Sequence, residues 1–224
     1  HTHTHTHTHA KHTKQARQIK PKQFETIRSK QALEARKARN HATSVYEYRG
    51  VHLFVMVHGF QGNANDMRLL KNNIALLFPE AMFLSSSANE DGTEGDILQM
   101  GVRLAQEVNT YINQYCPGAA LGRLSFIAHS LGGLIVRASL PYLEEHKDKF
   151  YNYFTLSSPH MGYMYNPSTI VDAGMWFLKT WRKSVCLQQL RMSDESDLEQ
   201  CCLYKLSQSK GLQWFKHIVL VSSY

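Results

Sequence analysis

The chain has 224 residues, of which 43% are apolar, and it carries a net charge of +7. This length suits one large domain or two small ones with an ordinary packed core. The charge is uneven, because residues 1–50 hold 11 Lys/Arg and 3 Asp/Glu, whereas residues 51–224 hold 14 and 15. Since the second part is nearly neutral, we do not expect it to bind nucleic acid.

Residues 1–49 are predicted to be a low-complexity, basic extension. Residues 1–9 alternate His and Thr, so they have no apolar face and we expect them to be disordered. A histidine-rich tract can bind metal. A repeated CA dinucleotide also encodes His-Thr, and we favour the interpretation that the tract is a translated microsatellite or an artefact of the gene model. Residues 11–45 lack a wide apolar stripe, which indicates a loosely helical segment. Its peripheral contact with a membrane surface or an anionic partner is left open.

From Val51 onwards, short β-rich runs alternate with longer amphipathic stretches. This pattern is typical of βαβ units and predicts an α/β fold with a mostly parallel sheet. Each run is nearly continuous in apolar residues, so we expect helices to cover both faces of every strand. The five predicted strands are 51–57, 81–86, 124–128, 153–157 and 217–222.

Two crossover helices are predicted between these strands. Thr93 with Asp96 three positions later resembles a capping box, and it would begin a helix that ends near Cys116. A shorter helix is predicted over residues 66–78. Its inward-facing residues are expected to be Met67, Leu70, Ile74 and Leu77. Right-handed crossovers would place the two helices on opposite faces, which is a doubly wound sheet.

One segment, Ala128-His129-Ser130-Leu131-Gly132-Gly133, carries the clearest chemical signal. It follows the third predicted strand and precedes an apolar helix over 134–143. A sharp strand-to-helix turn with serine at its apex lifts the hydroxyl above the sheet, and it needs small residues two positions on either side. Ala128 and Gly132 meet this need, although Gly is usual at the first position. We therefore predict Ser130 as a nucleophile; the alternative is a serine that caps the helix.

The helix after Ser130 would direct its free N–H groups and its positive dipole end toward a developing oxyanion. We predict the backbone N–H of Leu131 as one donor. The second is predicted to be the backbone N–H of Phe60, in the segment His58-Gly59-Phe60-Gln61-Gly62 that follows the first strand. His58 and His129 are interpreted as residues that shape the turns rather than transfer protons.

A serine nucleophile needs a histidine base that is oriented by a carboxylate, and in this type of fold the acid and then the histidine follow the serine. The candidates are His146, His160, His217, Asp172, Asp194 and Asp197. None of the histidines follows the last predicted strand. We therefore expect the acid and the base to lie beyond Tyr224, and this polypeptide to be inactive by itself.

Residues 160–215 concentrate methionine and aromatic side chains after the fourth strand. A cap-like insertion over the site would use such residues to contact acyl chains, or it would pack a small core of its own; both interpretations stay open. The four cysteines, Cys116, Cys186, Cys201 and Cys202, have no zinc-type spacing. We interpret them as buried thiols and expect an intracellular, cytoplasmic protein with no metal or cofactor. No apolar run is long enough to span a bilayer.

Four motifs carry a family resemblance: 55–62 (VMVHGFQG), 86–91 (SSANED), 128–133 (AHSLGG) and 156–166 (LSSPHMGYMYN). Together they resemble the serine esterase (lipase-like) domain of the "family with sequence similarity 135", over nearly all of residues 50–224. The resemblance implies an α/β-hydrolase fold, a role in cellular lipid metabolism and the nucleophile position for Ser130. It also implies a carboxy-terminal domain of a longer protein, with an aspartate past Tyr224, so the domain at 50–224 would be incomplete.

The expected function is hydrolysis of a carboxylic ester, of a small molecule or a lipid, through an acyl-enzyme on Ser130. Acyl transfer to an acceptor other than water shares this intermediate and stays open. A non-catalytic α/β-hydrolase scaffold for protein interaction is the alternative from another class, because no base can be placed within the chain.

Overall fold

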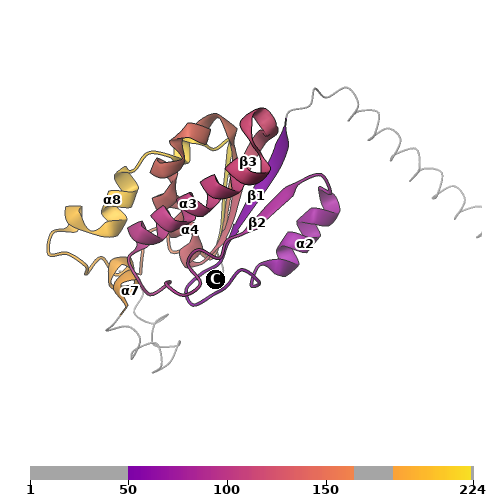
Figure 1. Cartoon of the computed structure of the whole chain (residues 1–224). Helices are drawn as coiled ribbons and strands as arrows, with labels where there is room; N and C mark the ends of the chain where they lie inside the picture. Colours follow the sequence, from indigo (N-terminus) through magenta and orange to yellow (C-terminus); the bar gives the residue numbers. More distant parts are fainter. Residues whose placement is uncertain (1–49, 164–183, 223–224) are drawn as a thin grey trace, which may run out of the picture. The chain divides into compact units, whose positions relative to one another are not determined.

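The computed structural model describes residues 50–163 and 184–222, which belong to one compact unit, Gly50–Tyr224. Within these residues, five parallel strands form one sheet in the order β2-β1-β3-β4-β5 (Figure 1). The strands are β1 (Val51–Val57), β2 (Met82–Ser85), β3 (Leu121–His129), β4 (Phe150–Leu156) and β5 (His217–Val221). The predicted parallel α/β sheet is thereby confirmed. The predictions for residues 1–49 lie outside the described part.

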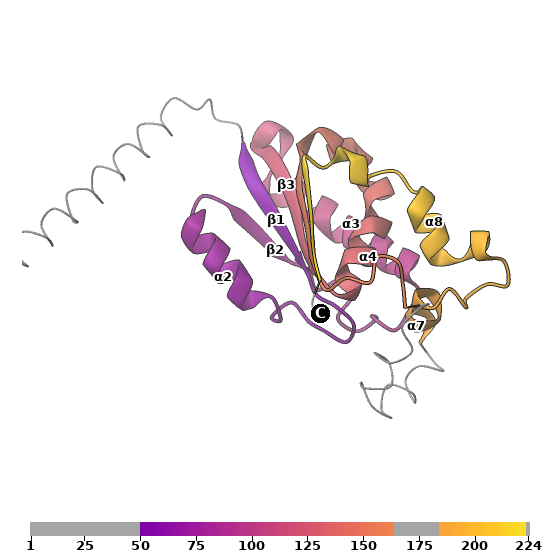
Figure 2. The same ribbon diagram turned by 180° about the vertical axis from the view of Figure 1, so that it is seen from behind.

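Helices lie on both faces of the sheet, as Figures 1 and 2 show from opposite sides. Helix α2 (Arg68–Leu77) connects β1 to β2 and covers one face, whereas α3 (Ile97–Tyr115) and α4 (Leu131–Ser139) lie together on the other. The doubly wound arrangement is therefore as predicted. The remaining helical segments are η1 (Gly118–Ala120), η2 (Leu140–Lys149), α7 (Val185–Leu190), η3 (Leu198–Gln200), α8 (Cys202–Gln208) and η4 (Leu212–Trp214).

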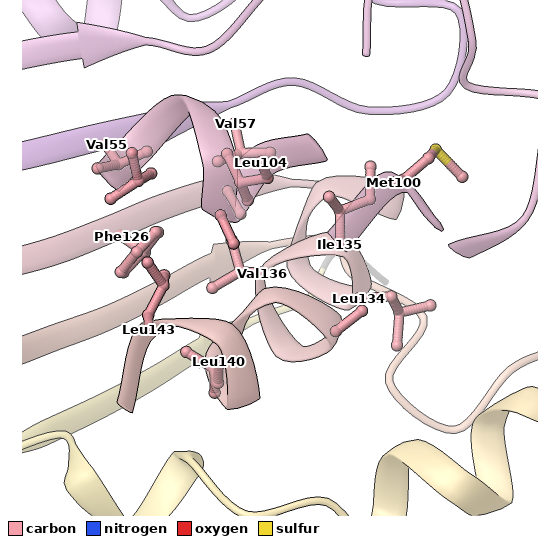
Figure 3. Close-up of a cluster of buried hydrophobic side chains, with 14 of the residues drawn as sticks. Val55, Val57, Met100, Leu104, Phe126, Leu134, Ile135, Val136, Leu140 and Leu143 are labelled. Carbon is pink, nitrogen blue, oxygen red and sulfur yellow. The ribbon is translucent and has the colours of Figure 1, made fainter. Parts of the chain in front are cut away.

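The core is divided between the two faces because strand side chains alternate in direction. Val55 and Val57 of β1 point toward α3 and α4, whereas Phe54 and Met56 point toward α2. Figure 3 shows the larger cluster, in which Leu104 of α3 meets the side chains of α4. Every residue of α4 is buried. Since each buried aliphatic side chain contributes roughly 1.5–3 kcal/mol, α4 is held firmly and so is the turn that precedes it.

Several details of the prediction are wrong, among them the starts of β3 and β4, which lie three residues earlier than expected. Helix α3 begins at Ile97, because Asp96 is its N-cap and accepts a hydrogen bond from the Gln99 N–H at 2.8 Å. Thr93 therefore does not cap this helix. Leu77 of α2 is 75% exposed rather than inward-facing. Among the described residues, β5 pairs only with β4 and all its residues are exposed, so it is not covered on both faces as expected.

Residues 184–215, the described part of the predicted cap-like region, pack into the larger core. Cys186 and Leu187 of α7, and Leu203 and Leu206 of α8, belong to the same cluster as α3 and α4. The methionine and aromatic residues between 164 and 183 lie outside the described part of the chain. Helices α7 and α8 therefore extend the helical layer that α3 and α4 form on one face of the sheet.

The four cysteines are all buried and free. Burial raises the pKa of the Cys186 thiol to about 11 and that of the Cys202 thiol to about 12, so both are protonated at neutral pH. Among residues 50–163 and 184–222, no three potential metal ligands lie together.

Candidate functional site

The chain makes a sharp turn at Ser130, between the end of β3 and the start of α4. Its φ of 52° and ψ of −125° lie in a region that L-residues rarely adopt. The Ser130 N–H donates to the Leu156 carbonyl at 2.9 Å, which ties the turn to the neighbouring strand β4. The Ser130 side chain makes no capping hydrogen bond with α4. Ser130 thus occupies the N-cap position of α4 at the apex of the turn, but its side chain does not cap the helix, so that interpretation is wrong.

The segment after β1, residues 58–62, lies directly against this turn. A Cβ atom on Gly59 would lie 2.9 Å from the Ser130 Cβ, and one on Gly132 would lie 2.6 Å from the carbonyl oxygens of both Val57 and His58. Real Cβ atoms do not approach other atoms so closely. Glycine at these two positions therefore lets the 58–62 loop meet the serine turn, as the two motifs predicted.

The peptide group between Gly59 and Phe60 is held in one orientation. Its carbonyl accepts hydrogen bonds from the Gly62 N–H at 3.1 Å and from Nδ1 of buried His58 at 3.0 Å. Because the carbonyl and N–H of a trans peptide point in opposite directions, the direction of the Phe60 N–H is fixed as well. A carbonyl can only accept, so His58 carries its proton on Nδ1.

Neither the Phe60 N–H nor the Leu131 N–H donates a hydrogen bond to another residue of the described part. Leu131 is the first residue of α4, where the N–H groups have no partner within the helix. Two donors that have no partner among the described residues thus belong to the two loops that meet at Ser130. Such donors, together with the positive end of the α4 dipole, can stabilise an oxygen that becomes negatively charged. His129, which is exposed, lies beside Gly59.

A pocket of about 320 Å³ opens at the carboxyl ends of β4 and β5. Its lining residues are Thr155, Ser158, His160, Met161, Leu220, Val221 and Ser222. The pocket adjoins the serine turn, because Gly133 of α4 packs against Ser158 and His160. Ser158 Oγ is buried and has no hydrogen-bond partner among the described residues. The wall is therefore polar near α4 and apolar along β5, which suits an amphipathic ligand.

His160 belongs to the wall of this pocket. Its Nε2 is 3.0 Å from Thr155 Oγ1, and its backbone carbonyl accepts a hydrogen bond from Arg137 at 3.1 Å. Burial, and secondly the charge of Arg137, lower the pKa of His160 below its usual value. The ring is therefore neutral at physiological pH, and these contacts hold it against β4.

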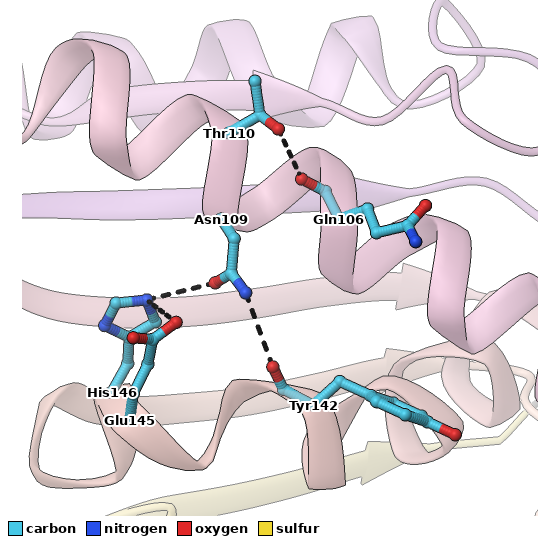
Figure 4. A network of polar contacts seen from close by, with 6 residues as sticks. All are labelled: Gln106, Asn109, Thr110, Tyr142, Glu145 and His146. Atoms are coloured by element: carbon cyan, nitrogen blue, oxygen red, sulfur yellow. Dashed lines mark hydrogen bonds and ion pairs between the residues drawn. The ribbon is translucent and has the colours of Figure 1, made fainter.

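The other histidines considered from the sequence lie elsewhere. His146 in η2 contacts Asn109 of α3 at 3.1 Å and Glu145 at 3.6 Å (Figure 4). His217 is the first residue of β5, so it lies at the amino ends of the parallel strands, whereas Ser130 lies at their carboxyl ends.

The candidate acids do not reach the serine turn either. Asp194 accepts the Cys202 N–H and Asp197 accepts the Glu199 N–H, whereas Asp172 lies outside the described residues. Within residues 50–163 and 184–222, the structure therefore brings no histidine with a carboxylate partner to Ser130.

Sequence reasoning missed part of this site. Thr155 and Ser158 were not predicted as pocket residues. Gln61 was predicted only as a member of the 58–62 segment, yet its φ is 51°. Ser130 and Ser157, which directly follow β3 and β4, also have positive φ. The conformation of such residues depends on tertiary contacts and cannot be read from spacing.

Comparison with known proteins gives one family and several relatives. The family described as "Putative serine esterase (DUF676)" matches residues 47–224. Two proteins of Saccharomyces cerevisiae, "Putative lipase YDL109C" and "Putative lipase ROG1", are 32% and 30% identical over 123 residues, which is 50% of this chain. The match covers only 18% and 17% of their own lengths.

Several solved structures are similar to this chain at low identity, among them a phospholipase and a lipase. Phospholipase PlaB from Legionella pneumophila is 15% identical with a TM-score of 0.49, covering 76% of this chain and 39% of that one. Bacillus licheniformis lipase BlEst2 in its propeptide form is 16% identical with a TM-score of 0.46, covering 76% and 35%.

Proposed function

This chain belongs to the family described as "Putative serine esterase (DUF676)", and from that premise we propose that it hydrolyses carboxylic esters through an acyl-enzyme on Ser130. The observation that carries the proposal is a serine held at the apex of a strand-to-helix turn, where two loops meet whose Phe60 and Leu131 N–H groups have no partner among the described residues. Such a site stabilises the tetrahedral intermediate that forms when a serine oxygen attacks an ester carbonyl.

The chemistry would proceed in two steps. In the first, Ser130 Oγ attacks the ester carbonyl, a general base takes the hydroxyl proton, and the alcohol leaves with a proton. The carbonyl oxygen is negatively charged in the intermediate, where the N–H groups of Phe60 and Leu131 donate to it. In the second step, water attacks the acyl-enzyme and releases the acid. Removing one donor of this kind typically lowers kcat by about 10²–10³.

We propose a lipid ester as the substrate. Support comes from the yeast relatives, whose names describe lipases, and from the apolar side of the pocket formed by Met161, Leu220 and Val221. No described helix has the length and apolarity to cross a membrane. Faster hydrolysis of long-chain than of short-chain esters, with that preference reduced by Leu220→Ser, would support a lipid substrate. On the four motifs quoted above, we also propose membership of the "family with sequence similarity 135".

A fluorophosphonate probe applied to the full-length protein tests the nucleophile. We expect Ser130→Ala to abolish covalent labelling and Ser207→Ala, an exposed serine on α8, to leave it unchanged. Labelling that survives in Ser130→Ala would refute the assignment.

A non-catalytic scaffold is the second candidate, because no histidine–carboxylate pair meets Ser130 within the described residues. This alternative predicts that the unaltered full-length protein is not labelled at all. It also predicts that Ser130→Ala leaves binding to any protein partner unchanged.

A further inference from the structure

Gln61 has an unusual backbone conformation at a sensitive place. It directly follows Phe60, and its φ of 51° lies in the left-handed region, which disfavours any residue that carries a Cβ atom. Such a conformation persists only where surrounding contacts hold it. The contacts of Gln61 therefore bear on how the Phe60 N–H is oriented.

Two residues from a distant part of the chain hold Gln61. The Gln61 N–H donates to Thr93 Oγ1 at 2.8 Å, and its side-chain Nε2 donates to Glu94 Oε1 at 2.6 Å. Thr93 is only 3% exposed, so water does not compete for its hydroxyl oxygen. It lies 32 positions after Gln61, in the turn before α3, and it is not needed as a cap, since Asp96 has that place.

Thr93 and Glu94 are themselves held from the other side by the start of α7. The Glu94 carbonyl accepts hydrogen bonds from the Val185 N–H at 2.9 Å and from Ser184 Oγ at 3.1 Å. The Thr93 carbonyl accepts from the thiol of Cys186 at 3.1 Å. Figure 1 shows α7 next to the loop that leads into α3. The support for Gln61 is thus built from two segments far apart in sequence.

Both peptide groups that flank Phe60 are therefore anchored. The carbonyl of the preceding peptide is held by His58 and Gly62, and the N–H of the following peptide is held by Thr93. With both planes held, the chain cannot rotate at Phe60 without breaking a hydrogen bond. A donor that is oriented before the reaction needs no reorganisation in the transition state.

We propose that Thr93 is a positioning residue for the oxyanion site, acting through Gln61 on the N–H of Phe60. The inference rests on the proposed esterase function. The hydroxyl oxygen of Thr93 accepts the hydrogen bond that holds Gln61 in the left-handed conformation, and the start of α7 holds Thr93 in place.

Thr93→Val and Thr93→Ser form a matched pair, tested in the full-length protein. Valine has nearly the shape of threonine but no acceptor, whereas serine keeps the hydroxyl. We expect Thr93→Val to lower the maximal rate of fluorophosphonate labelling of Ser130 by about tenfold or more, with little change in the probe concentration that gives half-maximal rate. Thr93→Ser is expected to stay within about threefold of the unaltered rate. A merely structural role would not separate the two parameters in this way.

Amide hydrogen exchange at Gln61 tests the hydrogen bond independently of catalysis. Exchange is expected to become faster in Thr93→Val and to stay slow in Thr93→Ser. Equal labelling rates in all three proteins would overturn the inference while leaving the esterase proposal standing, and so would an equal loss in both variants. If the unaltered protein is not labelled, the esterase proposal and the positioning role of Thr93 both fail, and the exchange data alone then decide whether Thr93 holds the loop.

Discussion

Replacing Ser130 by glycine is expected to make the domain more stable. The φ of 52° and ψ of −125° at this position are reached readily only by glycine, since a Cβ atom crowds the backbone there. The serine side chain makes no capping bond that would be lost. The substitution therefore removes strain without removing a capping hydrogen bond.

The size of the effect follows from two opposing terms. A non-glycine residue in such a conformation costs about 1–3 kcal/mol. Glycine also gains freedom in the unfolded chain, which costs about 0.5–1 kcal/mol of stability relative to alanine. We therefore expect Ser130→Gly to unfold with a free energy about 1 kcal/mol greater than Ser130→Ala. For a domain of this size, that difference raises Tm by roughly 2–4 °C.

Urea denaturation of the two variants, followed by circular dichroism, measures this difference directly. Alanine is the matched control, because it lacks the hydroxyl but keeps the Cβ atom that causes the strain. At ordinary helix or strand positions alanine is the more stable of the two. If Ser130→Gly is no more stable than Ser130→Ala, the turn is not strained and the reasoning fails.

Three further predictions concern stability. Burial, and secondly the charge of Arg123, lower the pKa of His52 to about 4, so the folded ring stays neutral where the unfolded ring, with its pKa near 6.5, takes up a proton. Stability is thus expected to fall as the pH drops from 6.5 toward 4, with His52 contributing about 1–2 kcal/mol after allowance for solvent screening of this partly exposed ring. His52→Phe should reduce that slope in urea titrations at several pH values, and His160, whose pKa is also lowered, accounts for part of the remainder. Gly132→Ala would place a Cβ atom 2.6 Å from two backbone carbonyl oxygens, so we expect a loss of about 1–3 kcal/mol and slower labelling of the serine; an unchanged urea midpoint would contradict this. Leu104→Ala, at a fully buried position of α3, should lower the free energy of unfolding by about 2–5 kcal/mol, as measured by thermal unfolding. A decrease below about 1 kcal/mol would show that Leu104 of α3 is not packed in the core.

The serine turn could be predicted because its signals are local. A strand followed by a serine, a glycine two residues later and an apolar helix is typical of a sharp strand-to-helix turn. Gly132 lies against the end of β1, so the 58–62 loop that follows β1 must lie beside this turn. All five strands were predictable for a similar reason, since apolar runs of this length are typical of buried parallel strands. Local pattern thus located the two loops that meet at the sheet edge.

Other features depend on partners that are distant in the sequence. Thr93 with Asp96 has the spacing of a cap, and nothing local distinguishes a threonine that caps a helix from one that binds Gln61. Leu77 follows the helical spacing of Leu70, yet it is exposed, because periodicity does not say how much surface the sheet offers. In β5 the apolar run is present, but burial requires a covering helix that the described residues do not supply.

The left-handed residues connect the fold to the site. Ser130 and Ser157 directly follow β3 and β4, and Gln61 lies in the loop after β1. The Gln61 N–H donates to Thr93, that of Ser130 to the Leu156 carbonyl and that of Ser157 to the Val221 carbonyl. The last two bonds extend the parallel ladder one residue past each strand, so the sheet itself holds the chain at the points where it turns. Strain that is held by a rigid sheet leaves little freedom for relaxation. Together with the Thr93 contact, this rigidity would keep the hydroxyl of Ser130 and the N–H groups of Phe60 and Leu131 in one arrangement, as the proposed site for an anionic intermediate requires.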